Sequence, residues 1–350
     1  MADQIHPSSK FLNLLAMEQS SVQQLFFQHI KNNLAPHLSF VDEIGEILGI
    51  SNDSAYRRIR GEKEITFEEI QKLSSHYKIS LDQFLHLKSN SFLFSGKLSQ
   101  DADGYEQWLK YLHQYLTYLL GFEQKHLYFL SKDIHGVYFF QEPVLSAFKS
   151  FVWMKSFLNY EDLKGRKFSL KNVVYPESLE LAKKLTYLYN QIPTTEIWNL
   201  ECINVLIQQI QYYAESNMFE SDEDMKIVFD KFIQLIDHIE RQAEIGKKYN
   251  MYESIKPNAA EFNLFYNEVV IGDNSFLADL GKAKVAFLNH SVLDFMSTQD
   301  ERFCNHMLNN IQGIIRKSTQ ISHVGEKNRS HFFNMLRQKI NRRRKMLGVF

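Results

Sequence analysis

The segment from residue 39 to residue 87 constrains the fold of this chain more than any other. It begins with apolar residues at helical spacing over residues 40–48, and this pattern stops at Gly49. A second short pattern over residues 52–60 stops at Gly61. A glycine after a helix favours the left-handed backbone with which many helices end, and Ser51 is a good N-cap for the next helix. The spacing therefore predicts two short helices joined by a tight turn.

Further caps and small residues extend this pair into a bundle. Gly45 and Ala55 are small enough to let the two helices approach closely where they cross. Thr66 and Glu69 have the spacing of a capping box, which predicts a third helix, and Ser80 is placed to cap another over residues 81–85. A preceding helix is predicted by apolar residues at three- and four-residue steps, namely Val22, Leu25, Phe26, Ile30 and Leu34.

The string Leu48-Gly49-Ile50-Ser51, followed by a helix from Asn52 to Arg60 and then Gly61, resembles the helix-turn-helix domain of the Xre and phage-repressor family. The resemblance covers residues 20–88. It implies a five-helix, lambda-repressor-like domain whose second motif helix enters the major groove of double-stranded DNA. One position departs from the family pattern, because Arg58 stands where a bulky apolar or aromatic residue is usual. This departure leaves open a small rotation of the recognition helix.

The resemblance also implies which side chains face DNA. Arginine presents a planar pair of donors to guanine, asparagine pairs with adenine in the same way, and lysine suits phosphate oxygens. Acidic side chains outnumber cations over residues 39–87, so we expect weak non-specific attraction to DNA. Two alternatives stay open: a solvated basic face, or a helix-turn-helix that contacts protein. The residues implied to face the groove are Asn52, Asp53, Tyr56, Arg57 and Arg60, with Arg58 and Lys63 nearer the phosphates.

The composition is typical of a globular protein with more than one domain. The chain has 350 residues, a formal net charge of −1 and 44% hydrophobic residues, which fits two or three folded domains rather than a disordered chain. Its two cysteines, Cys202 and Cys304, lack the spacing of a disulfide framework or a zinc site. The start lacks a signal-peptide pattern, and no apolar run is long enough to span a membrane. We therefore expect a cytoplasmic protein without a membrane contact.

The remainder of the chain predicts a larger, mostly helical domain. We expect the helix-turn-helix domain over residues 1–88, a linker over 89–104 and an α-rich C-terminal domain over 105–350. The helix expected at 105–119 has heptad spacing and either forms a dimer contact or packs within its own domain. The fold class expected is mainly α with a small antiparallel β element. Further helices are expected at 144–158, 177–191, 197–214, 225–248, 300–321 and 328–346, with strands at 127–130 and 137–140 and an antiparallel meander at 261–290.

Signatures of catalysis are missing from the sequence. The chain has no GxGxxG, GxxxxGKS/T, HExxH or GxSxG string, and its histidines are scattered, so we expect no enzyme, no cofactor and no metal. The aromatic cluster between residues 138 and 157 fits either an ordinary core or a hydrophobic effector pocket. The cationic run at 337–345 fits either a solvated helix end or a contact with flanking DNA phosphates.

These observations favour one function over another. The hypothesis is a cytoplasmic, sequence-specific transcriptional regulator, similar in arrangement to one-component bacterial regulators. It would bind double-stranded DNA as a homodimer, and its C-terminal domain would dimerise and sense a small molecule or peptide. The alternative is a protein-interaction module that uses the helix-turn-helix fold to dock a protein partner, without catalysis.

Overall fold

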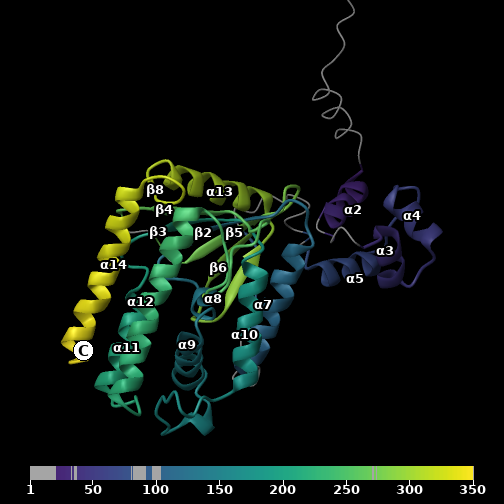
Figure 1. The fold of residues 1–350 in the computed structure, drawn as a ribbon. Helices are drawn as coiled ribbons and strands as arrows, with labels where there is room; N and C mark the ends of the chain where they lie inside the picture. Colours follow the sequence, from purple (N-terminus) through teal and green to yellow (C-terminus); the bar gives the residue numbers. More distant parts are fainter. Residues whose placement is uncertain are drawn as a thin grey trace, which may run out of the picture. The chain divides into compact units, whose positions relative to one another are not determined.

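The computed structural model describes residues 21–32, 34, 38–79, 81, 92–96, 104–269, 272 and 274–349. The chain divides into two compact units, Met1–Leu93 and Phe94–Phe350 (Figure 1). Most of the predicted linker at 89–104 lies outside the described residues, so the predicted domain boundaries stay a prediction. Ser80 and residues 82–85 of the predicted fifth helix lie outside them too.

The smaller unit is a helical bundle. Its described helices are α2 (Val22–Asn32), α3 (Phe40–Leu48), α4 (Asn52–Ile59) and α5 (Phe67–Tyr77). Each helix contributes apolar side chains to one buried cluster, which explains why the short helices are stable together although each alone would be marginal. The buried members of this cluster are Phe26, Phe27, Ile30, Ile44, Leu48, Ala55 and Leu73.

The larger unit contains an eight-stranded sheet. Strands β2, β3 and β4 run parallel to one another, and the other neighbouring pairs are antiparallel. The expectation of a mainly α protein with a small antiparallel element is therefore wrong, because a mixed sheet forms the centre of this unit. In sheet order the strands are β1 (Ser95–Gly96), β7 (Phe295–Thr298), β6 (Lys284–Asn289), β5 (Ser275–Asp279), β2 (His126–Ser131), β3 (Thr194–Trp198), β4 (Phe262–Tyr266) and β8 (Thr319–Gln320).

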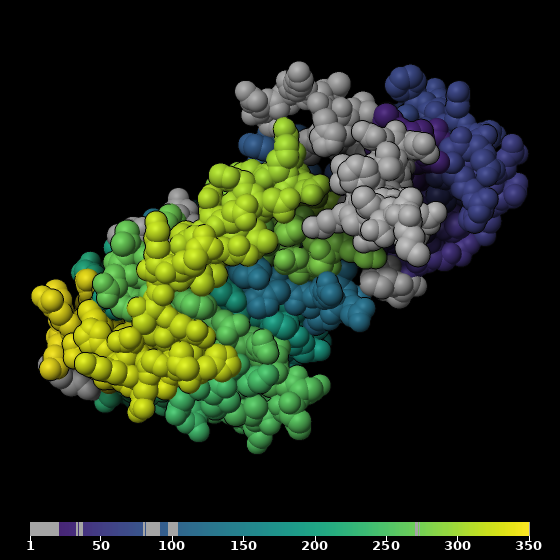
Figure 2. All heavy atoms as spheres, turned by 90° about the horizontal axis from the view of Figure 1, so that it is seen from above, coloured from purple at the N-terminus to yellow at the C-terminus, as the bar shows by residue number. Residues whose placement is uncertain are grey.

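Helices cover both faces of this sheet. One face packs against α13 (Glu301–Ile315), which lies over the sheet on the surface of the larger unit (Figures 1 and 2). Strand residues alternate between the faces: Leu127 and Phe129 join the larger core, whereas Ile197 and Leu277 pack with α13. The helices of the other face are α7 (Gly104–Leu120), α8 (Gly136–Phe139), α9 (Pro143–Ser156), α10 (Pro176–Tyr189), α11 (Asn204–Glu215), α12 (Asp222–Ile245) and α14 (Glu326–Met346).

Several elements of the larger unit differ from the prediction. Of residues 137–140, expected as a strand, the first three lie in α8 and Phe140 follows as its C-cap. The helix expected at 197–214 is instead strand β3 followed by α11, and the one expected at 300–321 ends at Ile315. The expected meander is correct for β5 and β6, which continue into β7, but β4 is separated from β5 by β2 and β3.

Strand β3 carries a charged residue in the middle of the sheet. Glu196 is fully buried and accepts hydrogen bonds from the hydroxyls of Tyr138 (2.8 Å) and Tyr189 (2.5 Å) and from the indole of Trp198 (2.9 Å). Burial alone would raise its pKa, but His135, 3.4 Å away, the nearby Lys248 ammonium and the Tyr189 hydroxyl lower the pKa to about 2. The carboxylate thus keeps its charge because the interior supplies enough donors.

The aromatic cluster between residues 138 and 157 and the cationic run at 337–345, each of which allowed two interpretations, both have structural roles. The aromatic residues Phe139, Phe140, Phe148 and Phe151 are buried in the larger core, so the core interpretation holds for them. The cationic run lies on α14, where Arg337 pairs with two acidic residues of α12 and Arg344 with a third. These ion pairs hold α14 against α12. None of the helices in the described chain has the length and apolar character needed to cross a membrane.

Candidate nucleic-acid interface

The turn between α3 and α4 has the backbone that its sequence predicts. Gly49 adopts a left-handed conformation with a φ of 68°, and the Ile50 N–H donates to the carbonyl of Gly45. The Ser51 hydroxyl accepts from the backbone N–H of Ser54 and caps α4. Both predictions, the glycine turn and the serine cap, are confirmed. The turn leaves three residues between the helices and therefore fixes their crossing.

Close packing at this crossing also fixes one predicted groove residue. A side-chain carbon added at Gly45 would lie 3.0 Å from the Asn52 Oδ1 atom and 3.1 Å from the carbonyl of Ile50, so Asn52 or the turn would have to shift to admit one. Asn52 donates from its Nδ2 atom to Asp42 of α3 at 2.7 Å. The Asn52 amide is exposed but held by α3, which orients it before any base is met.

The predicted groove residues share one exposed face of α4. A helix advances about 100° per residue, so positions 52, 53, 56, 57 and 60 fall within an arc of about 140°. All five residues at these positions are exposed. Ala55 and Arg58, on the opposite side, are buried. The structure therefore brings Asn52, Asp53, Tyr56, Arg57 and Arg60 together on a single surface.

The cations on this surface differ in how far they are engaged. Arg60 donates to the Tyr56 hydroxyl at 2.9 Å, lies 4.4 Å from the centre of that ring and is 3.6 Å from Glu62. Within the described part of the chain, the Arg57 side chain makes no hydrogen bond or ion pair. Lys63, in the turn after α4, is exposed as well. Arg57 is thus the arginine of this face whose donors are available without breaking an existing contact.

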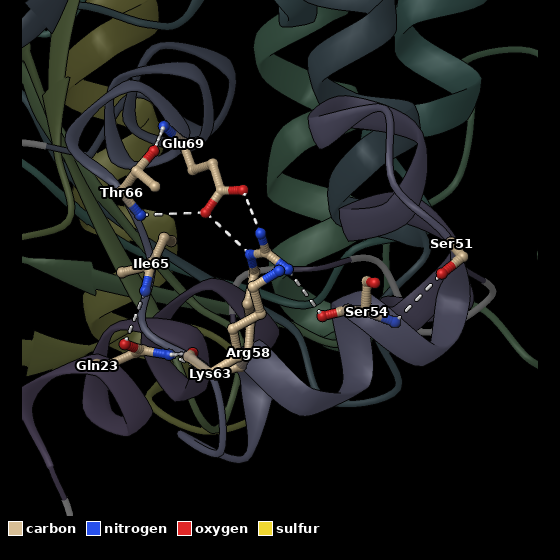
Figure 3. Close-up of polar contacts among 8 residues, drawn as sticks. All are labelled: Gln23, Ser51, Ser54, Arg58, Lys63, Ile65, Thr66 and Glu69. Atoms are coloured by element: carbon tan, nitrogen blue, oxygen red, sulfur yellow. Dashed lines mark hydrogen bonds and ion pairs between the residues drawn. The ribbon is translucent and has the colours of Figure 1, made fainter.

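Arg58 does not lie where the sequence placed it. It was expected near the phosphates, but its side chain is only 7% exposed and forms a two-pronged ion pair with Glu69 at 2.7 and 2.9 Å (Figure 3). It also donates to the carbonyl of Ser54. The stem of Arg58 fills the position where the family usually has an apolar residue, while Glu69 neutralises its charge. This correction removes Arg58 from the candidate DNA surface.

Glu69 links this ion pair to the cap of α5. Its carboxylate accepts from the Thr66 N–H at 3.1 Å, and the Thr66 hydroxyl accepts from the Glu69 N–H at 3.2 Å. The predicted capping box is therefore confirmed. Burial alone would raise the pKa of Glu69, but the bonds from Arg58 and Thr66 lower it. One carboxylate thus joins α4 to the start of α5.

Gln23 of α2 has a supporting role that the sequence did not reveal. Its Nε2 atom donates to the carbonyls of Arg58 and Lys63, both at 2.7 Å, and its Oε1 atom accepts from the Ile65 N–H at 3.1 Å (Figure 3). Gln24 donates in the same way to the carbonyl of Arg60 at 2.7 Å. These two amides satisfy backbone groups at the end of α4 and in the following turn. Nothing in the local sequence around a glutamine on an amphipathic helix indicates that it will bind backbone groups distant in the chain.

One segment of the chain, which includes this turn and the helices on either side of it, is similar to a known domain family. Residues 29–103 match the BetR domain. This is a helix-turn-helix type of DNA-binding domain, and the matched segment contains α3, α4 and α5. The narrower resemblance to Xre and phage-repressor proteins stays a prediction. Comparisons of the chain with curated proteins and with solved structures found no match.

Across the described residues, no three His, Cys, Asp or Glu side chains are grouped to hold a metal ion.

Proposed function

We propose that this protein is a sequence-specific transcriptional regulator that acts by binding DNA rather than by catalysis. In this proposal the exposed face of α4 enters the major groove, with Arg57 and Arg60 reading base edges and Lys63 contacting a phosphate. The observation that carries the proposal is the contrast within α4. One side is buried and anchored by Arg58, while the other, together with the C-cap Arg60, presents two arginines, an asparagine, an aspartate and a tyrosine to solvent.

The acidic character of the smaller unit supports a dimer. Non-specific affinity scales with the number of phosphates that cations neutralise, and one short helix with few cations neutralises few. Two copies double these contacts and read two half-sites about 34 Å apart. We therefore propose a homodimer, and we assign effector sensing and dimerisation to the larger unit. An effector would act by changing the spacing or angle of the two recognition helices.

Selection of bound duplexes from a random library tests this function with the full-length protein. Two related half-sites separated by one helical turn are expected, and a repeat at higher salt gives the number of phosphate contacts from the change in affinity. Recovery of random sequences, together with capture of a protein partner that depends on α4, would instead support the docking module.

Substitutions on α4 separate base contact from general charge. Arg57→Ala is expected to weaken specific binding by roughly five- to 150-fold if the arginine pairs with one guanine, since such a contact contributes about 1–3 kcal/mol. It should also relax the preference at a single base position. Lys72→Gln removes a cation of α5 that is also exposed and is the matched control. Equal small losses for both variants would show that α4 supplies charge but no base recognition.

A further inference from the structure

The backbone of Arg60, at the end of the candidate recognition helix, is fixed at both of its polar groups. Arg60 is the C-cap of α4 and keeps a right-handed helical conformation. Its N–H donates to the carbonyl of Tyr56 at 3.0 Å, and its carbonyl accepts from the Gln24 amide at 2.7 Å. The Arg60 side chain therefore leaves α4 in a defined direction.

The Arg60 side chain is itself held by Tyr56. Residues four apart are neighbours on a helix surface. The guanidinium lies over the Tyr56 ring, 4.4 Å from its centre, and its Nη2 atom donates to the Tyr56 hydroxyl at 2.9 Å. The two side chains remain accessible, because Arg60 is 57% exposed and Tyr56 is 44% exposed. A guanidinium that is oriented before binding loses less conformational freedom when it pairs with a ligand.

The position of Arg60 favours base edges over phosphates. At about 100° per residue, Arg60 lies about 80° from Asn52, near the middle of the arc of about 140° that the exposed residues share. The middle of such a face points to the floor of the groove, where the base edges lie. Glu62, 3.6 Å from the Nη1 atom, offsets part of the charge. This weakens attraction to phosphates, whereas the neutral acceptors O6 and N7 of guanine require directed donors.

We propose that each half-site contains a guanine that Arg60 reads, and that Tyr56 is the positioning residue that holds Arg60 for this contact. Glu62 lowers the affinity of the same arginine for phosphates and so favours specific over non-specific binding. This assignment rests on the proposed function, to which it adds the base that is recognised and the pair of side chains that recognises it.

A double-mutant cycle with the full-length protein and its selected duplex tests the positioning role. Arg60→Ala is expected to weaken binding by roughly five- to 150-fold, Tyr56→Phe by about threefold and Tyr56→Ala by about tenfold. In an Arg60→Ala background, Tyr56→Ala should change the affinity by less than about twofold, because no guanidinium is left to position. Tyr212→Ala removes an exposed tyrosine of α11 and is the matched control. Equal losses from Tyr56→Ala with and without Arg60 overturn the positioning role.

A modified base tests the contact with guanine. Replacing the guanine by 7-deazaguanine removes the N7 acceptor, which should weaken binding of the unsubstituted protein by about three- to tenfold and leave binding of Arg60→Ala unchanged. Glu62→Gln should raise the affinity for random duplexes. If Arg60→Ala weakens selected and random duplexes by the same factor and lowers the salt slope by about 0.9, Arg60 contacts a phosphate and the proposal is overturned.

Selection with the unsubstituted protein separates this assignment from the function on which it rests. Recovery of random sequences contradicts the proposed function, and the assignment fails with it. Recovery of defined half-sites that lack a guanine, or whose recognition is unchanged by both Arg60→Ala and Tyr56→Ala, overturns the assignment alone.

Discussion

Removing either partner of the ion pair between Arg58 and Glu69 should destabilise the smaller unit, but by different amounts. Glu69→Ala leaves a guanidinium that is 7% exposed without its partner and also removes half of the capping box. Breaking a buried pair costs about 3–5 kcal/mol, and because Glu69 is 15% exposed we expect the lower end, about 3 kcal/mol. Arg58→Met keeps the apolar stem, and the carboxylate can turn to water, so we expect a loss of only about 1 kcal/mol.

Hydrogen exchange measured on the full chain provides the assay. The Glu69→Ala variant should raise the opening equilibrium of amides in α4 and α5 by about a hundredfold, since each 1.4 kcal/mol is a factor of ten. The double variant Arg58→Met/Glu69→Ala should be more stable than Glu69→Ala alone, with a coupling of about 2 kcal/mol. Additive effects of the two substitutions, or a larger cost for Arg58→Met than for Glu69→Ala, would refute this account of the pair.

Three further predictions concern the same supports. Folding lowers the pKa of Glu69, so its contribution to stability is present above the ordinary carboxyl pKa of about 4.3 and is lost as the pH falls through the folded value. In Glu69→Gln, the free energy of unfolding should therefore fall less steeply as the pH is lowered through this range. Gln23→Ala removes three hydrogen bonds to backbone groups, so exchange of residues 58–65 should rise at least tenfold, while exchange in α13 stays unchanged. Gly246 has a φ of 71° and packs against the His323 ring. Gly246→Ala should therefore lower the melting temperature of the larger unit by several degrees. An unchanged melting temperature would contradict the close contact between Gly246 and His323.

The parts of the smaller unit that could be predicted are those with local signals. Gly49, Ser51 and the Thr66–Glu69 box each act within four residues, so the sequence alone exposes them. The burial of Arg58 escaped prediction because its partner is eleven residues away on another helix. The same holds for Gln23, whose targets lie 35 to 42 residues further along the chain.

The larger unit was harder to predict because its sheet depends on distant pairing. Strand β3 is buried on both faces, so it lacks the alternation of apolar and polar residues that marks a half-exposed strand. The charged Glu196 also interrupts the apolar run that is typical of a fully buried strand. Residues 137–139 have high strand propensity, yet tertiary packing places them in α8. The predicted neighbours β4 and β5 are close in sequence, but β2 and β3 lie between them in the sheet.

The pairing of β1 has a consequence for the order in which the chain acquires its structure. Ser95 and Gly96 directly follow the smaller unit, but they pair with Ser297 and Met296. During synthesis, the helical bundle can form from nearby residues soon after it leaves the ribosome, whereas this short edge strand must wait for about 200 more residues. Strand β1, at the start of the larger unit, is therefore expected to be among the last strands to find its partner in a newly made molecule.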